Sequence, residues 1–388
     1  MKTFDTIIIG GGIVGLTSAF ILSQQKKNVL LIEQRTFGHD GGSSHGDGRM
    51  TRYAYGADEA IYLEMVKQSF VGWEKLSLLG KTQLVQTTGL LNFGSPNSIH
   101  LDELEIAFAD SKIAYEHLTA SECNQRFPQF HVEPNTEVIY EPSGGIIFAD
   151  KAIQTLAKLC RGNGVTLITG ERVQSIIPHN DLVTIKTQAG TNYIGKSTVI
   201  ATGGWANHLL AELDVNLDLE VTQEQFAFFR STGDINHAVG VMPNCLDYHT
   251  DQPLYSLAEV DGNGVKVGWH HTGKVINADK PLPVDQNALE VVIDFVKRRF
   301  PHLDPNPIHV KPCLYTNTAD YHFVMDRHPQ FSNIILAVGF SGHGFKFGTV
   351  LGEIVASLIN QTAPPVAIDL FTLGRFQKSD SLKRRVTA

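Results

Sequence analysis

The sequence predicts an α/β fold with two domains, one built on a largely parallel sheet and the other mainly on antiparallel strands. Residues 4–33 show the order strand, glycine-rich turn, helix, strand. A strand (residues 333–338), a glycine-rich turn (residues 339–344) and a helix (residues 345–360) follow one another again near the end of the sequence. In between, residues 220–273 are mostly extended. The parallel sheet should therefore combine the two ends of the chain with parts of its middle.

The N-terminal unit is the clearest element. Residues 4–9 (FDTIII) are short, apolar and rich in β-branched side chains, which indicates a buried strand. Residues 16–25 are predicted to form a helix, and residues 28–33 (NVLLIE) form a second apolar strand that ends in Glu33. This is a βαβ unit within about 30 residues.

The remaining elements follow from the same periodicities. Residues 39–48 (HDGGSSHGDG) are polar, rich in glycine and too long for a simple connector, so we interpret them as a functional loop. Further helices are predicted for residues 59–79, 152–163, 205–212 and 287–300, and further strands for residues 88–93, 165–168, 173–178, 183–187 and 197–201.

Composition narrows the class of protein. The chain has 388 residues, 42% of them hydrophobic, and a net charge of −8 from 32 basic and 40 acidic residues. This length is typical of two domains with substantial cores. The negative balance disfavours non-specific binding to nucleic acid or to an anionic membrane, so we expect neither partner.

The four cysteines, Cys123, Cys160, Cys245 and Cys313, form no CxxC pair and no metal-finger spacing. We therefore expect free thiols, a reducing compartment and no metal site. No signal peptide, no apolar run of membrane-spanning length and no usable anchor signal is recognisable, so a cytoplasmic location is expected.

A dinucleotide-binding fingerprint lies in the N-terminal unit. Gly10, Gly12 and Gly15 have the GxGxxG spacing between a strand and a helix, and Glu33 closes the next strand. The glycines permit a tight turn, a close approach to a pyrophosphate and close packing of the helix, and the acid can bind ribose hydroxyls. The position at the N-terminus, with a later strand ending in residues 201–204 (ATGG), favours FAD over NAD.

Two basic clusters follow. Residues 45–56 contain Arg49 and Arg52, which could present cations to a flavin or to a carboxylate. The alternative is a solvated surface turn. In residues 264–271, strand alternation places Lys266 and His270 on one face. An inward lysine is costly unless it is paired or functional, and the alternative is an ordinary edge-strand lysine.

A third cluster combines residues 311–315 (KPCLY) with residues 339–347 (GFSGHGFKF). Cys313 alone is most simply an inert buried thiol. The glycine loop, in contrast, could let the backbone approach a flat cofactor.

Taken together, the segments GGSSHGDGR…TRYAYG, VKVGWH, CLYT and GFSGHGFKF, in this order and spacing, resemble the monomeric sarcosine oxidase family. That family includes N-methyltryptophan oxidase and pipecolate oxidase. The resemblance covers nearly the whole chain. It implies a glutathione-reductase-like FAD-binding domain (residues 1–80, 145–215 and 320–388) and an antiparallel-sheet substrate domain (residues 81–144 and 216–319).

The resemblance also implies roles for single residues. FAD would be attached to Cys313 through an 8α-S-cysteinyl bond, Lys266 would activate oxygen, and Arg52 and Lys346 would hold the substrate carboxylate. Arg49 and His45 would lie near the flavin, with pocket residues Tyr255, His270 and Tyr315. Cofactor contacts would come from Gly10, Gly12, Gly15, Glu33, Val173, Gly342, His343, Gly344 and Lys346.

The implied reaction oxidises a secondary-amine amino acid with O₂ and yields the demethylated amine, formaldehyde and H₂O₂. Sarcosine ranks first as substrate, before N-methyl-L-tryptophan and L-pipecolate. A flavin dehydrogenase with another electron acceptor, or a flavin-binding assembly or regulatory protein without turnover, are the alternatives. A monomer is compatible with the resemblance, and the oligomeric state stays open. Two departures from the family, Gly48 for threonine and Ser44-His45 for His-His, lie in the flavin-side loop.

Overall fold

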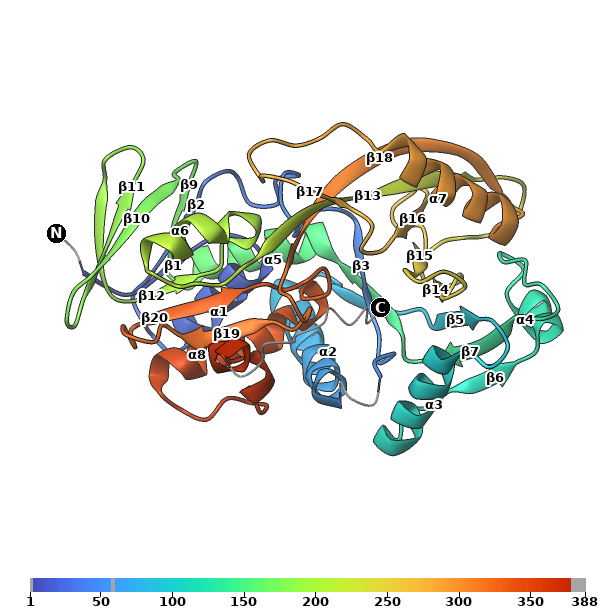
Figure 1. The fold of residues 1–388 in the computed structure, drawn as a ribbon, viewed down its shortest axis with the longest axis horizontal. Helices are drawn as coiled ribbons and strands as arrows, with labels where there is room; N and C mark the ends of the chain where they lie inside the picture. Colours follow the sequence, from blue (N-terminus) through green and yellow to red (C-terminus); the bar gives the residue numbers. More distant parts are fainter. Residues whose placement is uncertain (1–2, 57–59, 378–388) are drawn as a thin grey trace.

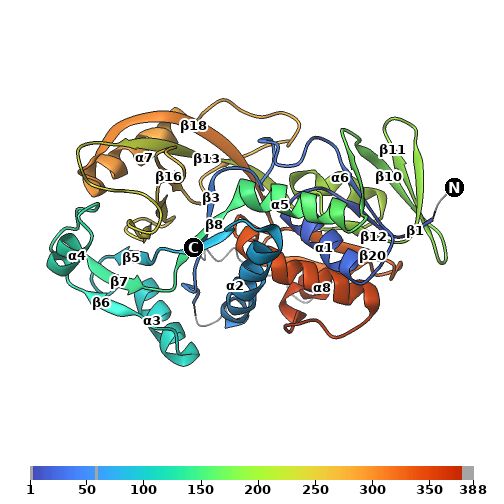
Figure 2. The ribbon, with the colours of Figure 1, turned by 180° about the vertical axis from the view of Figure 1, so that it is seen from behind.

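The protein's structure is a computed structural model that describes residues 3–56 and 60–377. Residue 59 of the predicted second helix and the last residues of the predicted FAD domain therefore lie outside the described residues. Figure 1 shows an elongated molecule in which one sheet with its helices lies beside a second sheet, and Figure 2 shows the same arrangement from behind.

The first sheet is the predicted, largely parallel one. Strands β1 and β12 pair in parallel, as do β1 and β2, β2 and β9, and β12 and β20. The long strand β12 also pairs with β11 in antiparallel orientation through its first half. The eight strands are β1 (Thr3–Ile9), β2 (Val29–Glu33), β9 (Thr166–Thr169), β10 (Val173–Pro178), β11 (Val183–Thr187), β12 (Asn192–Ile200), β19 (Val324–Arg327) and β20 (Ile334–Val338).

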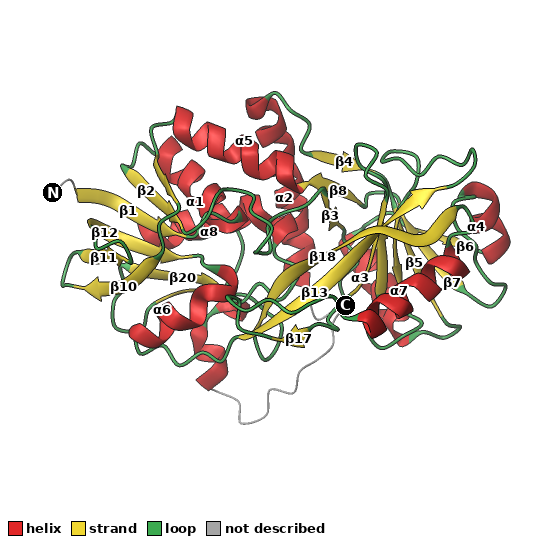
Figure 3. Cartoon of the chain, turned by 90° about the horizontal axis from the view of Figure 1, so that it is seen from above, coloured by secondary structure: helices red, strands yellow, loops and turns green. Residues whose placement is uncertain are grey.

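Helices cover both faces of this sheet. Helices α1 (Ile13–Gln24), α2 (Ala60–Gly80), α5 (Ala149–Gly162) and α8 (Gly348–Asn360) share one apolar core with it, and α6 (Ala206–Glu212) packs on the opposite face (Figure 3). Helix α1 begins three residues before the predicted start, because Ile13 is already helical and buried. The predicted helix from residue 345 instead begins with a 3₁₀ turn, η3 (Phe345–Phe347), and becomes α-helical at Gly348.

The second sheet has nine strands, and all of its pairs except β14–β5 are antiparallel. Helix α7 (Gln286–Arg299) packs on it within a second core. Its strands are β5 (Leu90–Gly94), β6 (Glu116–Leu118), β7 (Glu137–Glu141), β13 (Glu220–Ser231), β14 (Asn244–Asp247), β15 (Leu254–Leu257), β16 (Val265–Trp269), β17 (Lys274–Val275) and β18 (Leu303–Asn317).

A small third sheet joins the two halves. It consists of β3 (Gly48–Thr51), β4 (Val85–Thr87) and β8 (Gly145–Phe148), all antiparallel. Two helices of the outer edge, α3 (Ile99–Ser111) and α4 (Ala120–Arg126), complete the main elements. In the part of the chain that the structure describes, no helix is both long and apolar enough to cross a membrane.

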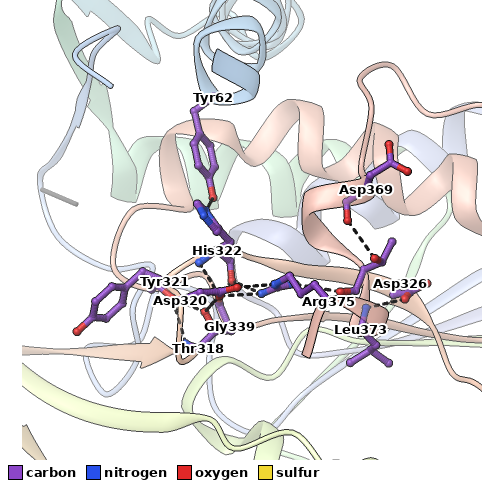
Figure 4. A network of polar contacts seen from close by, with 12 residues as sticks. Tyr62, Thr318, Asp320, Tyr321, His322, Asp326, Gly339, Asp369, Leu373 and Arg375 are labelled. Atoms are coloured by element: carbon purple, nitrogen blue, oxygen red, sulfur yellow. Dashed lines mark hydrogen bonds and ion pairs between the residues drawn. The ribbon is translucent and has the colours of Figure 1, made fainter. Parts of the chain in front are cut away.

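The C-terminal segment Asp369–Gln377 lies against the loop before β19 (Figure 4). Arg375 contacts Asp320 through Nε at 2.7 Å and through Nη2 at 3.1 Å, and Nη2 also donates to the His322 carbonyl at 2.9 Å. The Leu373 N–H donates to Asp326 Oδ2 at 2.8 Å. The Tyr321 carbonyl of the same loop lies 3.2 Å from His343 Nε2.

Candidate active site

One large cavity runs along the carboxyl edge of the parallel strands. Strands β1, β12 and β20 end there, and each is followed by a glycine-rich turn that lines the cavity. Ligands of open parallel sheets bind at this edge. The opposite wall comes from β15, β16 and β18 of the second sheet, so the cavity lies between the two large sheets.

One end of the cavity has the geometry of a dinucleotide site. Glu33 accepts hydrogen bonds from the Gly11 N–H at 2.7 Å and from the Arg35 N–H at 2.8 Å. Gly10 has a φ of +106°, and a Cβ there would lie 2.3 Å from the Ala201 carbonyl oxygen. The N-terminus of α1 begins at this turn and offers N–H groups to a phosphate.

Hydrogen bonds hold the polar loop of residues 39–48 along the cavity. The Ser43 hydroxyl donates to the Leu314 carbonyl at 2.5 Å, and Ser44 Oγ accepts from the Ile13 N–H at 3.1 Å. The Gly46 N–H donates to Asp150 Oδ1 at 2.8 Å. Ser44, one of the two departures from the family, thus binds the first turn of α1.

Arg49 folds back over this loop. Its guanidinium donates to the carbonyls of Gly48 and Ser43, both at 2.9 Å, and to that of His45 at 2.5 Å. His45 itself is buried and lies outside the cavity lining. Burial, together with Arg49 and Lys266, lowers the pKa of His45 to about 3, so this imidazole is neutral.

Lys266 enters the cavity from β16, and His270, predicted to share its face, lines the same cavity. The residue is only 5% exposed, and its Nζ lies 3.9 Å from the centroid of the Phe226 ring and 3.4 Å from the Gly48 carbonyl oxygen. Burial, with the neighbouring Arg49 cation, lowers its pKa to about 7, against the opposing effect of Cys313. A lysine in this state can gain or lose its proton near neutral pH.

Cys313 lies on the neighbouring wall, in β18. It is a free, buried thiol, and burial raises its pKa to about 11 while Arg49 and Lys266 act in the opposite direction. Thiolates, not thiols, are the nucleophilic form of cysteine. The two cations offset burial only in part, so Cys313 is a protonated thiol near neutral pH.

The far end of the cavity collects the other two cations. Arg52 follows β3, and its Cζ lies 4.4 Å from the centroid of the Tyr55 ring. Lys346 comes from η3, and its Nζ donates to the Tyr55 hydroxyl at 2.7 Å. Both cations are buried. Trp73 Nε1 donates to the Lys346 carbonyl at 2.8 Å and so fixes the backbone of that lysine.

Aromatic and imidazole groups complete the wall. His270 Nδ1 and the Tyr315 hydroxyl lie 2.9 Å apart, and His343 Nδ1 lies 3.2 Å from the Tyr55 hydroxyl. Burial holds the pKa of both His270 and His343 well below the usual range, so both rings are neutral. Gly342 has a φ of +78°, and a Cβ there would meet the Tyr315 ring at 2.3 Å.

The charge of the cavity is strongly asymmetric. Among the described residues that line it, the carboxylates are Glu33 and Glu171, both at the dinucleotide end. Arg49, Arg52, Lys266 and Lys346 lie at the other end. That end is suited to an anionic ligand, because clustered cations in a low-dielectric cavity attract negative charge.

Most of the predicted site residues meet in this cavity. Its lining includes Gly10, Gly12, Glu33, Arg49, Arg52, Val173, Tyr255, Lys266, His270, Cys313, Tyr315, Gly342, His343, Gly344 and Lys346. His45 and Gly15 are not part of the lining. Gly15 has a packing position instead, since a Cβ there would lie 1.9 Å from the Gly10 carbonyl oxygen. The contribution of Tyr55 was not predicted, although it lies three residues after Arg52.

The cavity fits FAD. The glycine cradle with Gly10 at positive φ and the Glu33 carboxylate accept an ADP group, and the cavity continues from there to the cations and to Cys313. Gly11, Gly12 and Ser44 would hold the pyrophosphate end, and Lys266, Cys313 and Gly342 would surround the ring end.

Comparison with known proteins supports the same class. Residues 5–358 match the model of the family described as FAD dependent oxidoreductase. The chain is 33% identical to the human "Peroxisomal sarcosine oxidase", with 96% of each chain covered. It is 30% identical to a "Monomeric sarcosine oxidase" of Bacillus sp. (strain NS-129), with 98% of each covered. Among solved structures, NikD, "an unusual amino acid oxidase essential for nikkomycin biosynthesis", superposes with a TM-score of 0.86 at 22% identity, covering 96% of this chain and 98% of the other.

The fold and the cavity thus define an FAD-dependent oxidoreductase. The chain belongs to the FAD dependent oxidoreductase family, and its relatives within that family include sarcosine oxidases. The predicted fold class and the resemblance found in the sequence are both confirmed.

Proposed function

We propose that the protein oxidises a small amino acid that carries a secondary amine, with sarcosine as the first candidate. The observation that carries this proposal is the pair of buried cations, Arg52 and Lys346, that converge on Tyr55 at the end of the cavity. Two relatives named sarcosine oxidase, at 33% and 30% identity, support it. The products would be the demethylated amine, formaldehyde and H₂O₂.

Each group has a defined part in this proposal. Arg52 offers a planar fork that can bind a carboxylate through two hydrogen bonds, and Lys346 adds a point charge. His270 is neutral and can accept or donate a hydrogen bond near the substrate amine. Bound FAD would supply hydride acceptance and electron transfer to O₂. Lys266 places a cation where negative charge would develop on oxygen.

The test compares sarcosine with its amide, which keeps the amine but lacks the carboxylate. In wild-type protein we expect the acid to react with a much higher kcat/KM. Arg52→Ala should lower kcat/KM for the acid about tenfold to a hundredfold and change that for the amide little, since hydrogen bonds to charged groups contribute about 1.5–3 kcal/mol. Arg52→Lys is the control that keeps the charge without the planar fork, and its kcat/KM for the acid should lie between those of the wild type and Arg52→Ala. Equal turnover of acid and amide would refute the proposal.

A panel of substrates is needed to identify which amino-acid side chain the cavity accepts. Sarcosine, N-methyl-L-tryptophan and L-pipecolate should be compared by peroxide release and by oxygen consumption. We expect peroxide in proportion to oxygen, with sarcosine fastest. Anaerobic bleaching of the flavin without peroxide formation in air would show that the electron acceptor is not O₂.

We also propose that FAD is bound covalently through Cys313. The cysteine is unpaired and lies in the cavity wall, where Arg49 and Lys266 act against the rise in its pKa that burial causes. Acid-precipitated wild-type protein should remain yellow, and Cys313→Ser should release its flavin into the supernatant. Cys245→Ser, which alters another buried thiol, is the control and should remain yellow. A colourless wild-type pellet would exclude the bond.

A further inference from the structure

A buried carboxylate lies behind the substrate end of the cavity and takes no part in its lining. Glu141 is the last residue of β7 and is fully buried. Its Oε1 accepts a hydrogen bond from the Tyr53 N–H at 2.8 Å. Within the described part of the chain, its Oε2 has no hydrogen-bond partner. Such a group is costly to bury and needs an explanation.

Glu141 holds the turn that carries the substrate cations. Both backbone polar groups of Tyr53 are bound. Its N–H donates to Glu141, and its carbonyl accepts from the Tyr55 N–H at 2.8 Å. Arg52 is the residue before Tyr53, and its guanidinium lies over the ring of Tyr55. The geometry of residues 52–55 therefore depends on an acceptor at the position of Glu141.

The electrostatics of the carboxylate point to the same turn. Burial raises the pKa of Glu141 to about 7, while the Tyr53 and Ala54 N–H groups and the Arg52 cation act to lower it. Three of the four opposing groups belong to residues 52–54, and the fourth is the Ser143 hydroxyl, which donates to Oε1 at 3.5 Å. With a pKa of about 7, the carboxyl is close to half ionised at neutral pH, and its ionised form is the one that Arg52 and these N–H groups favour.

We propose that Glu141 is a positioning residue that holds the turn of residues 52–55, so that Arg52 lies over the Tyr55 ring in the cavity wall and recognises the substrate carboxylate. The inference rests on the proposed function, because it assumes that Arg52 binds that carboxylate. Glu141 acts through the turn and does not itself contact the ligand.

The test measures binding of two unreactive ligands rather than turnover. Methoxyacetate has the shape of sarcosine with an ether oxygen in place of the amine, and methoxyacetamide is its neutral counterpart. Dissociation constants of the flavin-loaded protein are measured by calorimetry. Glu141→Ala should raise the dissociation constant of methoxyacetate about tenfold and change that of methoxyacetamide by no more than about twofold. Glu141→Gln keeps an acceptor but loses the charge, so its dissociation constant for methoxyacetate should lie between those of the wild type and Glu141→Ala. It replaces the alanine variant in the test if that variant does not fold.

Glu224 provides a matched control. It is also a buried carboxylate and accepts backbone N–H bonds, from Thr272 at 3.0 Å and Gly273 at 2.8 Å, but it does not bind the turn of residues 52–55. Glu224→Gln should leave the ratio of the two dissociation constants unchanged. Equal weakening of both ligands by Glu141→Ala, or unchanged acid affinity in the folded variant, would overturn the inference.

Arg52→Ala separates the two proposals. If Arg52→Ala keeps the preference for acid over amide, the proposed function itself fails. If Arg52→Ala abolishes that preference while both Glu141 variants retain it, only the positioning role fails. In the Arg52→Ala background, Glu141→Ala should have almost no further effect on methoxyacetate, because the two residues act on one interaction.

Discussion

Lys346 and Tyr55, 291 positions apart in the sequence, are joined by a 2.7 Å hydrogen bond from Nζ to the phenolic oxygen. The same Tyr55 ring lies 4.4 Å from the guanidinium carbon of Arg52. A single aromatic side chain therefore fixes the separation of two cations that come from opposite ends of the chain. Ring faces attract cations without neutralising them.

Tyr55→Phe tests this relationship. The ring and its contact with Arg52 remain, but Lys346 loses its hydroxyl partner and retains the His343 carbonyl at 3.3 Å. We expect kcat/KM for the acid substrate to fall about tenfold, mainly through KM, since about 1.4 kcal/mol corresponds to a factor of ten. Steady-state oxygen consumption measures this. A fall in kcat with unchanged KM would contradict the assigned role.

Lys266 should give the reaction with oxygen a pH dependence. Its pKa is lowered to about 7, so its charge is present below that value and is lost as the pH rises through it. The rate of flavin reoxidation in stopped flow should fall accordingly. A negative charge on the bound cofactor would move the midpoint upward without changing the direction.

In Lys266→Met the flavin should be reoxidised slowly at every pH, while the rate of its anaerobic reduction by substrate should change much less. Lys266→Arg keeps a cation that does not titrate in this range and serves as the control. Equal losses in both half-reactions of the methionine variant would show that Lys266 has no special part in the oxygen step.

Local patterns predicted the dinucleotide end of the site and the lysine. Gly10, Gly12 and Glu33 lie within one βαβ unit, so their spacing in the sequence determines their spacing in the fold. Strand alternation predicted a common face for Lys266, in β16, and His270, just after it, and both residues line the cavity. Both inferences need only contacts between neighbouring elements.

The substrate end depends on contacts that no local pattern contains. Glu141 reaches Tyr53 across 88 positions, and Tyr55 meets Lys346 only after the two ends of the chain have packed together. Strand β18 was not predicted because Pro305, Pro307 and Pro312 interrupt its pattern. It pairs nevertheless along β13, with register shifts near Pro307.

Gly48 is a packing requirement of this chain. A Cβ at Gly48 would lie 2.5 Å from Ile146 Cδ1, and Ile146 is fully buried. Gly48→Thr, which restores the residue usual in the family, should lower the free energy of unfolding by about 1–3 kcal/mol through overpacking. Urea denaturation measures this. Gly162→Ala, with no atom within 4 Å of the added Cβ, is the control and should not destabilise.

Ile146→Ala should then cost less in the Gly48→Thr background than in the wild type, because the smaller residue relieves the clash. Strictly additive losses in the double variant would show that Ile146 is not what excludes a side chain at position 48.

The Arg375–Asp320 pair should stabilise the protein through the C-terminal segment (Figure 4). The two side chains are only 12% and 9% exposed, so removal of one leaves a largely buried charge without its partner. Arg375→Met should lower the free energy of unfolding by about 3 kcal/mol. The double variant with Asp320→Asn should recover part of that loss, because the uncompensated charge is gone.

The same pair predicts how this difference changes with pH. Although burial opposes it, Arg375 lowers the pKa of Asp320 below 3.8. The carboxylate's contribution is therefore fully present above the ordinary value and is lost as the pH falls through the lowered one. The stability advantage of the wild type over Arg375→Met should shrink in acid and remain constant near neutrality. A difference that is independent of pH down to the acid range would show that the segment is held by its apolar contacts, such as buried Phe371, rather than by the ion pair.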